Sequence, residues 1–177
     1  MNKVLVWDLF KELWKEQYAT RHGRRGQPQH GVDIYGRPSE ADKWEGVQVK
    51  GKEGAYGAKV TADELRAEVE KAKGFDPPLH RFVLVASSPR DASIQAAARA
   101  ITQDHLSKGL FAADVWGWED VEERLALFPS IVQRHYPQFF SSVGSSGSEA
   151  GRLLGSNPLD KVNLDRVTQA IQDTYGI

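Results

Sequence analysis

Two short strand-like segments separated by turn-forming residues constrain this fold more than any other part of the chain. Residues 31–35 (GVDIY) and 44–50 (WEGVQVK) carry the β-branched residues and the alternation typical of strands. The residues between them, 36–43, include the Gly, Pro, Ser and Asp that favour turns. The stretch therefore predicts a β-hairpin.

Alternation along these strands predicts one polar and one apolar face. It places Asp33 opposite Val32 and Ile34. In the second strand Gln48 and Lys50 share one face, and the valines beside them share the other. We therefore expect a carboxylate, an amide and an ammonium group to meet on the polar face of the hairpin.

This combination of groups suits a divalent metal and a phosphate. The Asp33 carboxylate and the Val49 carbonyl both offer the hard oxygen atoms that Mg²⁺ prefers. The Lys50 ammonium group can hold a phosphate or a water molecule. The alternative is that the motif is a chance hairpin with no chemical role.

The motif Gly-Val-Asp33, a spacer, and then Gln48-Val-Lys50 resembles the PD-(D/E)XK nuclease superfamily. More narrowly, it resembles the Mrr-type restriction endonuclease branch, in which Gln replaces the second acid. The flanking sequences GRRGQPQHGVDI and VQVKGK are also similar, and the resemblance spans about residues 5–140. It implies an α/β, restriction-endonuclease-like fold with a mixed central β-sheet flanked by helices.

The resemblance also implies the chemistry, which is Mg²⁺-dependent hydrolysis of phosphodiester bonds in DNA, with Mn²⁺ as a substitute. Asp33, the Val49 carbonyl and an acid of the first helix would hold the metal, and Lys50 would orient the attacking water. Gln48 lies in the same metal site, but it is a neutral amide where most relatives have an acid. We therefore expect weak metal binding.

The acid on the first helix remains open between two residues. Apolar spacing predicts this helix over residues 4–18. Asp8 matches the helix-start pattern of the resembling family, whereas Glu12 lies nearer the edge of the apolar stripe. The alternative is that these acids are exposed and pair with neighbouring lysines of the same helix.

Net charge argues against bulk attraction to nucleic acid, because the chain carries a formal charge of −1. Any DNA contact must then come from a local patch. The candidates for such a patch flank the hairpin and are Arg21, Arg24, Arg25, His30 and Lys52. The alternative is a solvated basic loop in which the histidine has no direct role.

After the hairpin, helices and strands alternate. The predicted helices span residues 61–73, 92–106 and 118–127, and the predicted strands span residues 82–86 and 110–116. Thr61 with Glu64 forms a capping-box signal, and Asp91 is expected to be an N-cap. Residues 129–140 are expected to form a short helix or an irregular segment. A hairpin followed by this alternation predicts a mixed sheet flanked by helices.

Composition divides the chain into a domain over 1–140, a flexible Gly/Ser linker over 141–157 and an amphipathic helix over 158–177. The resemblance implies that the first of these is an Mrr-like nuclease domain. The last segment suggests the start of a further domain. The resemblance implies an N-terminal effector of antiphage defence proteins, fused to an NTPase-type sensor and acting as a homodimer or larger assembly. Because the first apolar run is short and broken by Asp8, we expect a cytoplasmic chain with no membrane partner.

Three functions are consistent with the sequence. The first is a metal-dependent DNA endonuclease in restriction or antiphage defence. The second is a catalytically inactive nuclease-fold module for DNA binding or assembly, which the near-neutral charge and Gln48 favour. The third is a nuclease acting on RNA.

Overall fold

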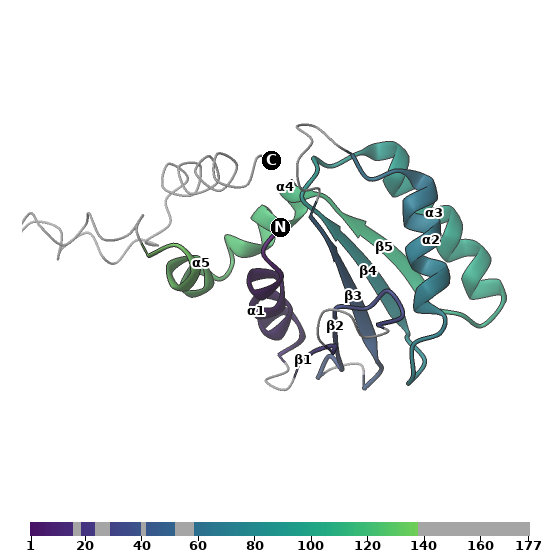
Figure 1. Ribbon diagram of the computed structural model, residues 1–177, viewed down its shortest axis with the longest axis horizontal. Coiled ribbons are helices and arrows are strands. Elements are labelled where there is room, and N and C mark those ends of the chain that lie inside the picture. Colours follow the sequence, from purple (N-terminus) through teal and green to yellow (C-terminus); the bar gives the residue numbers. More distant parts are fainter. Residues whose placement is uncertain (16–18, 24–28, 40–41, 52–58, 138–177) are drawn as a thin grey trace, which may run out of the picture.

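The protein has a mixed five-stranded sheet at its centre, with helices on both faces (Figure 1). The structure is a computed structural model that describes residues 1–15, 19–23, 29–39, 42–51 and 59–137. The strands follow one another across the sheet in the order β1-β2-β3-β4-β5. The predicted α/β class, with a mixed central sheet flanked by helices, is confirmed.

The direction of the strands changes at the third one. The strands are β1 (Thr20–Arg21), β2 (Ile34–Gly36), β3 (Glu45–Lys50), β4 (Arg81–Ala86) and β5 (Ala112–Trp116). The first three pair antiparallel, and β3, β4 and β5 pair parallel. The predicted hairpin is confirmed, since Ile34 pairs with Val47. Strand β1 was missed, because two residues within a basic, Gly-containing stretch carry no strand pattern of their own.

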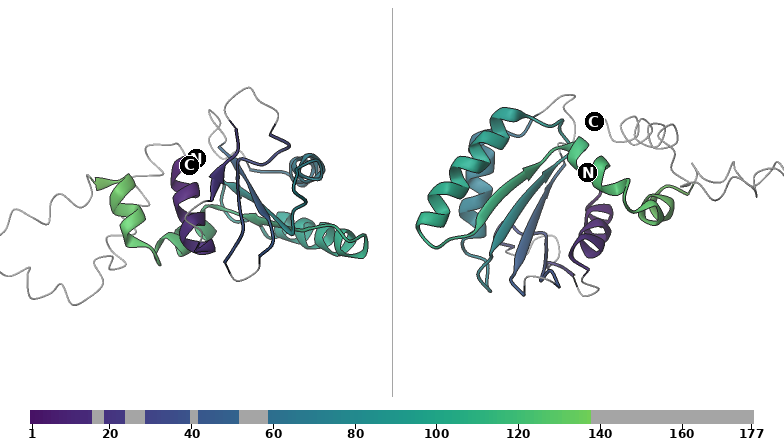
Figure 2. Two further views of the ribbon diagram at one scale, coloured as in Figure 1. Left: turned by 90° about the horizontal axis from the view of Figure 1, so that it is seen from below. Right: turned by 180° about the vertical axis from the view of Figure 1, so that it is seen from behind.

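Five helices lie in the described part of the chain and form two layers. They are α1 (Lys3–Trp14), α2 (Ala62–Ala72), α3 (Ala92–Ser107), α4 (Trp118–Leu125) and α5 (Pro129–His135). Helices α2 and α3 cover one face of the sheet, and α1, α4 and α5 lie on the other (Figure 2). Helix α1 ends earlier than predicted, because Lys15 adopts a left-handed conformation at φ 50°.

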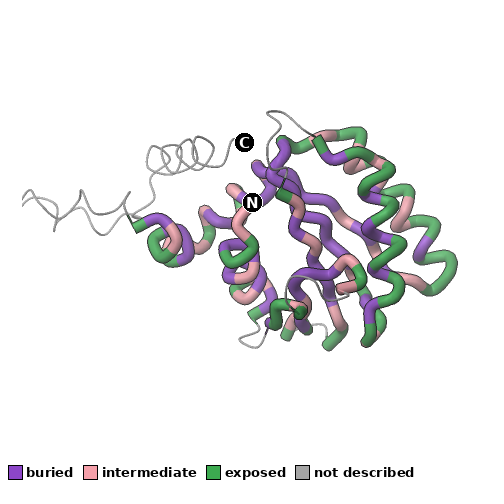
Figure 3. The backbone as a smooth tube through the Cα atoms, viewed as in Figure 1, coloured by how far each residue is buried: buried purple, intermediate pink, exposed green. Residues whose placement is uncertain are grey.

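The sheet separates two hydrophobic cores. Val47 and Val49 of β3 pack with α1, α4 and α5, whereas Phe82 and Leu84 of β4 pack with α2 and α3. Strand β4 is buried on both faces, as its unbroken apolar run predicts (Figure 3). Its neighbour β3 therefore ends beside a strand that is buried on both faces.

The expected alternation around Asp33 is wrong. Val32 packs in the core under α2 and α3, but Ile34 packs in the core under α1, so these two side chains lie on opposite faces. Asp33 precedes β2, although its N–H donates to the Val47 carbonyl at 2.8 Å and its carbonyl accepts from the His22 N–H at 2.7 Å. Strict alternation fails because the backbone bends here and is not regular strand.

Local capping signals were predicted correctly. Thr61 and Glu64 form the reciprocal capping box of α2, with side-chain to backbone distances of 3.2 and 2.8 Å. The Asp91 carboxylate caps α3 by accepting from the Ser93 N–H at 2.9 Å. Both helices therefore begin within a residue of their predicted starts.

Some predictions lie outside the described residues. These are the linker over 141–157, the helix over 158–177 and three candidate DNA contacts, Arg24, Arg25 and Lys52. Within the described ranges, no helix is both long enough and apolar enough to cross a membrane.

Candidate active site at the end of strand β3

Asp33 is a buried carboxylate held at the C-terminal end of β3. Its side chain is 3% exposed. Oδ2 accepts a hydrogen bond from the Val49 N–H at 2.9 Å, and Oδ1 accepts one from the Lys3 ammonium group at 2.7 Å. Both oxygens therefore have a positively polarised partner, one from β3 and one from the first turn of α1.

The path of the chain before Asp33 depends on Gly31. This residue has φ +67°, in the left-handed region that glycine adopts without strain. A Cβ atom there would lie 3.0 Å from Lys71 Cβ and 3.1 Å from the Glu68 carbonyl oxygen. Gly31 thus lets the loop approach α2 closely before the chain turns toward β3.

Lys50 ends β3 and is bound by the carboxylate of Glu68, which is not among the predicted site residues. Its ammonium nitrogen lies 2.7 Å from Glu68 Oε1, and Lys71 Nζ lies 2.9 Å from the same oxygen. Burial raises the pKa of Glu68, but hydrogen bonds from both lysines and their charges outweigh it, so the pKa lies below its usual value. Glu68 is therefore an ionised, buried partner of Lys50 at neutral pH.

A signal for Glu68 was present in the sequence. Leu65, Glu68 and Ala72 are spaced at i, i+3 and i+7, so the acid falls within the apolar stripe of α2. All three side chains are buried in the structure. An acid in such a stripe needs a partner from another element, and here Lys50 supplies it.

The expected single polar face is divided between the two sides of the sheet. Gln48 is half-buried, and Lys50 turns to the α2 side, where it meets Glu68. Asp33 is instead bonded to Lys3 of α1, which covers the opposite side. The carboxylate and the lysine thus both lie at the C-terminal end of β3, each with its own counter-ion on a different side of the sheet.

Asp8, a candidate metal ligand, joins α1 to α5. Its buried carboxylate lies 2.8 Å from His135 Nε2, 3.3 Å from Arg134 and 3.5 Å from Lys11. Burial raises the pKa of Asp8, but the His135 hydrogen bond and the charges of Lys11, Arg134 and His135 outweigh it and lower the pKa. The partners of Asp8 therefore lie on α5 and on its own helix, and not at Asp33.

Glu12, the other helix candidate, is exposed. It lies about 13.5 Å further along the helix axis than Lys3, and Asp8 about 7.5 Å further. The residue of α1 that reaches Asp33 is thus Lys3, one turn or more before either predicted acid. The structure does not bring Asp8 or Glu12 to the Asp33 carboxylate.

The described candidates for DNA contact are exposed. Arg21 lies opposite Ile34 in the sheet, next to Asp33, and its guanidinium carbon lies 5.0 Å from the centroid of the Trp7 ring. His30 adopts a left-handed φ of 48° and lies against Gly74 at the end of α2. Arg21 is therefore placed on β1 beside Asp33, whereas His30 is placed at the C-terminal end of α2.

The chemical types of the oxygen donors near the end of β3 suit a hard cation. Asp33, Gln48 and Val49 offer carboxylate, amide and carbonyl oxygen, the ligand types that Mg²⁺ prefers. The Lys3 ammonium group already places a positive charge at Asp33 Oδ1, and its side chain is 54% exposed, so it can move away. No group of three or more histidine, aspartate or glutamate side chains suited to a metal lies within the described residues. A metal at Asp33 would therefore need amide or carbonyl oxygens as well.

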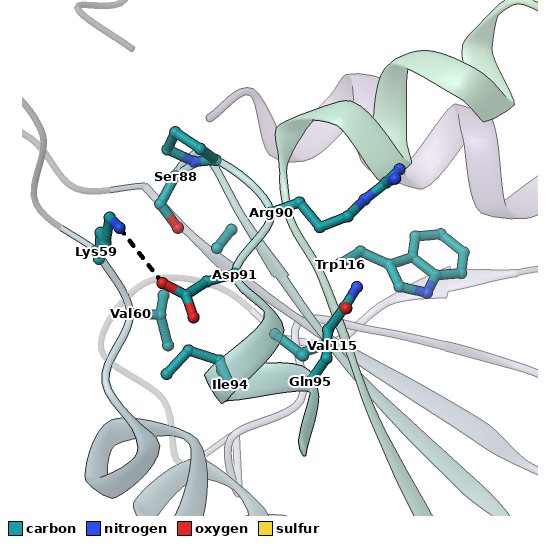
Figure 4. A pocket seen from close by; sticks show the side chains of 12 residues that line it. Lys59, Val60, Ser88, Arg90, Asp91, Ile94, Gln95, Val115 and Trp116 are labelled. Carbon is teal, nitrogen blue, oxygen red and sulfur yellow. Dashed lines mark hydrogen bonds and ion pairs between the residues drawn. The ribbon is translucent and has the colours of Figure 1, made fainter. Parts of the chain in front are cut away.

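A small pocket lies beside this site, at the C-terminal ends of the parallel strands β4 and β5 (Figure 4). The Ser87 N–H donates to the Lys50 carbonyl at 3.2 Å, and this hydrogen bond links the end of β4 to the candidate site. In the pocket, hydrogen bonds from Ser93 and then from Lys59 lower the pKa of Asp91 to about 2. The Lys59–Asp91 pair, at 3.3 Å, closes one side of the pocket.

No family model, no curated protein and no solved structure matches this chain. The candidate site is therefore defined by its own geometry.

Proposed function

We propose that this protein is a metal-dependent endonuclease that hydrolyses DNA phosphodiester bonds, with a restriction-endonuclease-like fold of the Mrr type within the PD-(D/E)XK superfamily. The observation that carries the proposal is the buried Asp33 carboxylate. It is bonded to the Val49 N–H at the end of the strand that presents Gln48 and Lys50.

Each of these groups has a distinct role in the proposed reaction. Asp33, the Val49 carbonyl and the Gln48 amide would hold Mg²⁺ or Mn²⁺. When bound, the metal would polarise a phosphate oxygen and lower the pKa of a water molecule. The Lys50 ammonium group orients that water and stabilises the negative charge that develops on the phosphate.

The biological setting is part of the same proposal and is supported by the sequence resemblance. The chain would act as an effector domain in antiphage defence or restriction. It would work as a homodimer or larger assembly, in partnership with a sensor or NTPase domain. Double-stranded DNA is the proposed substrate.

Plasmid cleavage tests the proposal directly. Purified protein is incubated with supercoiled plasmid and Mg²⁺, Mn²⁺ or EDTA, beside Asp33→Asn and Lys50→Met. We expect metal-dependent nicking or linearisation that both substitutions abolish. Asp42→Asn and Lys43→Met remove the same charges from exposed positions in the turn before β3, and they should leave cleavage unchanged.

Cleavage that survives Asp33→Asn would place the chemistry elsewhere. Comparing labelled duplex DNA with labelled RNA under the same conditions identifies the substrate. If RNA is cut and DNA is not, the proposal that DNA is the substrate is wrong, although the site would stand.

A second candidate function is a catalytically inactive DNA-binding or assembly module. The observation that favours it is that the structure gives Asp33 and Lys50 one intrachain counter-ion each, Lys3 and Glu68. DNA binding without cleavage by concentrated wild-type protein in Mn²⁺, even after forced dimerisation, would support this function over the nuclease.

A further inference from the structure

A cluster of three charged side chains lies at the end of β3, on the side covered by α2. The ammonium groups of Lys50 and Lys71 both donate hydrogen bonds to Glu68 Oε1, at 2.7 and 2.9 Å. The two nitrogen atoms therefore lie close together around one oxygen. One carboxylate therefore faces two cations, and the cluster has a surplus of one positive charge.

The burial of the three side chains differs in a way that suits binding from solvent. The Glu68 side chain is 6% exposed, whereas those of Lys50 and Lys71 are 37% and 57% exposed. The negative charge thus lies beneath the two positive charges, and the surface presented to solvent is cationic.

The cluster also adjoins the proposed reacting position. Lys50 follows Val49, whose N–H holds Asp33. Gly31, two residues before Asp33, packs against Lys71 and Glu68 so closely that an added Cβ would lie 3.3 Å from Glu68 Oε2. A DNA strand with one phosphate at Asp33 would therefore pass close to both lysines.

We infer that the Lys50–Glu68–Lys71 cluster is a phosphate-binding subsite for the DNA backbone, in which Lys71 contacts a phosphate and Glu68 is a positioning residue for Lys50. The inference rests on the proposed function and extends it to two residues of α2. Two partly exposed ammonium groups attract a phosphate. The buried carboxylate holds them in place beforehand, which reduces the entropy lost on binding.

DNA binding without metal tests the role of Lys71. Fluorescence anisotropy of a short labelled duplex is measured in EDTA over a range of NaCl concentrations. Loss of one phosphate contact should make the plot of log K against log salt shallower by about 0.9. If the two proteins bind equally at about 1 M salt, the variant should bind about eightfold more weakly at about 0.1 M salt. We expect this change for Lys71→Met.

Lys73→Met is the matched control. Lys73 is the C-cap residue directly after α2 and is paired with Glu70, whose side chain is 66% exposed. Its substitution removes the same charge from nearly the same region, and we expect no comparable loss of affinity or slope. Equal losses for the two variants would overturn the assignment of Lys71.

Glu68→Gln tests the positioning role. The substitution keeps the size of the side chain and removes the negative charge between the lysines. The stronger attraction for phosphate offsets the lost preorganisation, so DNA affinity should stay about the same. Cleavage should fall about tenfold or more in kcat with no increase in KM, because Lys50 loses its anchor. A merely structural residue would instead weaken binding and cleavage together, with a lower Tm, and that result would reject the positioning role.

The outcomes separate this inference from the nuclease proposal. A wild-type chain that binds DNA through Lys71 but does not cut it supports the subsite and rejects the nuclease. A wild-type chain that cuts DNA, with binding unchanged in Lys71→Met, rejects the subsite alone. A chain that does not bind the duplex at all overturns the subsite.

Discussion

Lys3 is a counter-ion of Asp33 that no sequence pattern predicted. Its ammonium group lies 2.7 Å from Asp33 Oδ1, on a carboxylate that is 3% exposed. A metal bound by Asp33 must compete with this ammonium group, because both require the same oxygen. Lys3 is therefore an internal counter-ion of the proposed metal site.

Replacing Lys3 tests this competition. Lys3→Met should strengthen Mn²⁺ binding by up to about fivefold, because a partly exposed ion pair contributes up to about 1 kcal/mol. Isothermal titration calorimetry without DNA measures the effect, with Lys43→Met as the control for net charge. Equal Mn²⁺ affinities for wild type and Lys3→Met would show that Lys3 does not occupy the metal position.

Gly31 offers a second test at the residue scale. Gly31→Ala forces a left-handed backbone on alanine and places a Cβ 3.0 Å from Lys71 Cβ. Gly109→Ala is a matched control, because Gly109 has φ +69° but nothing lies within 4 Å of an added Cβ. We expect Gly109→Ala to lower the free energy of unfolding by about 1 kcal/mol through backbone strain, and Gly31→Ala to lower it further through the clash.

Urea unfolding followed by tryptophan fluorescence measures both variants. The difference between them reports how tightly the loop before Asp33 packs on α2. If the two variants lose equal stability, the close approach of Gly31 to Glu68 and Lys71 is wrong.

Helix α2 carries Glu68 and Lys71, so its stability bears on the candidate site. Thr61 caps its first turn by accepting from the Glu64 N–H at 3.2 Å, and Glu64 returns a bond to the Thr61 N–H. Thr61→Ala should lower the free energy of unfolding by about 1 kcal/mol, whereas Thr61→Ser should retain most of it. Chemical denaturation of the two variants checks this, and an equal loss in both would exclude the cap as the cause.

The secondary structure could be predicted element by element where its signals are local. The capping residues Thr61 and Asp91 and the apolar run of β4 depend on neighbours in sequence, and all three predictions are confirmed. Strand β1 and the bend at Asp33 depend on pairing with distant strands and were not predicted. Non-local hydrogen bonds, and not side-chain pattern, define these two features.

At the scale of the whole molecule, two cores share one sheet, and β4 contributes to both. Leu84 is fully buried beneath α2 and α3. Leu84→Ala should lower the free energy of unfolding by about 2–5 kcal/mol, because it removes buried methyl groups and leaves a cavity. Leu127→Ala, at a side chain that is 69% exposed, should change it little. Thermal and urea unfolding measure both, and a small effect at Leu84 would contradict the burial of β4.

Acid should destabilise the fold through its buried carboxylates. The pKa values of Asp8 and Glu68 lie below their usual values in the folded chain, so each carboxylate stabilises the fold once pH exceeds its usual pKa. This stability is lost as pH falls through the lowered pKa. We expect a nearly flat free energy of unfolding from about pH 5 to 7 and a decline below about pH 4.5.

The variant Asp8→Asn isolates one contribution to this pH dependence. It should be less stable than wild type at neutral pH, because His135 and Arg134 lose their partner, and its stability should decline less in acid. Urea unfolding across this pH range measures the difference. Parallel curves for the two proteins would show that the α1–α5 ion pairs do not contribute to acid sensitivity.

Local sequence patterns are enough to predict the class of fold and the side chains of the candidate site. Hydrophobic periodicity and caps depend on residues a few positions apart, so they predict helices, strands and a mixed sheet without knowledge of packing. The motif of Asp33, Gln48 and Lys50 likewise indicates the end of β3 as the candidate site, and β3 does end at Lys50.

The pairing of those groups depends on how the helices pack on the sheet. Lys3 lies 30 residues from Asp33 in sequence, Glu68 lies 18 from Lys50, and His135 lies 127 from Asp8. These partners meet because α1 packs on one face of the sheet and α2 on the other, and no local pattern encodes that arrangement. The electrostatics of the candidate site follow from packing, because a buried charge must find its counter-ion on whichever element lies beside it.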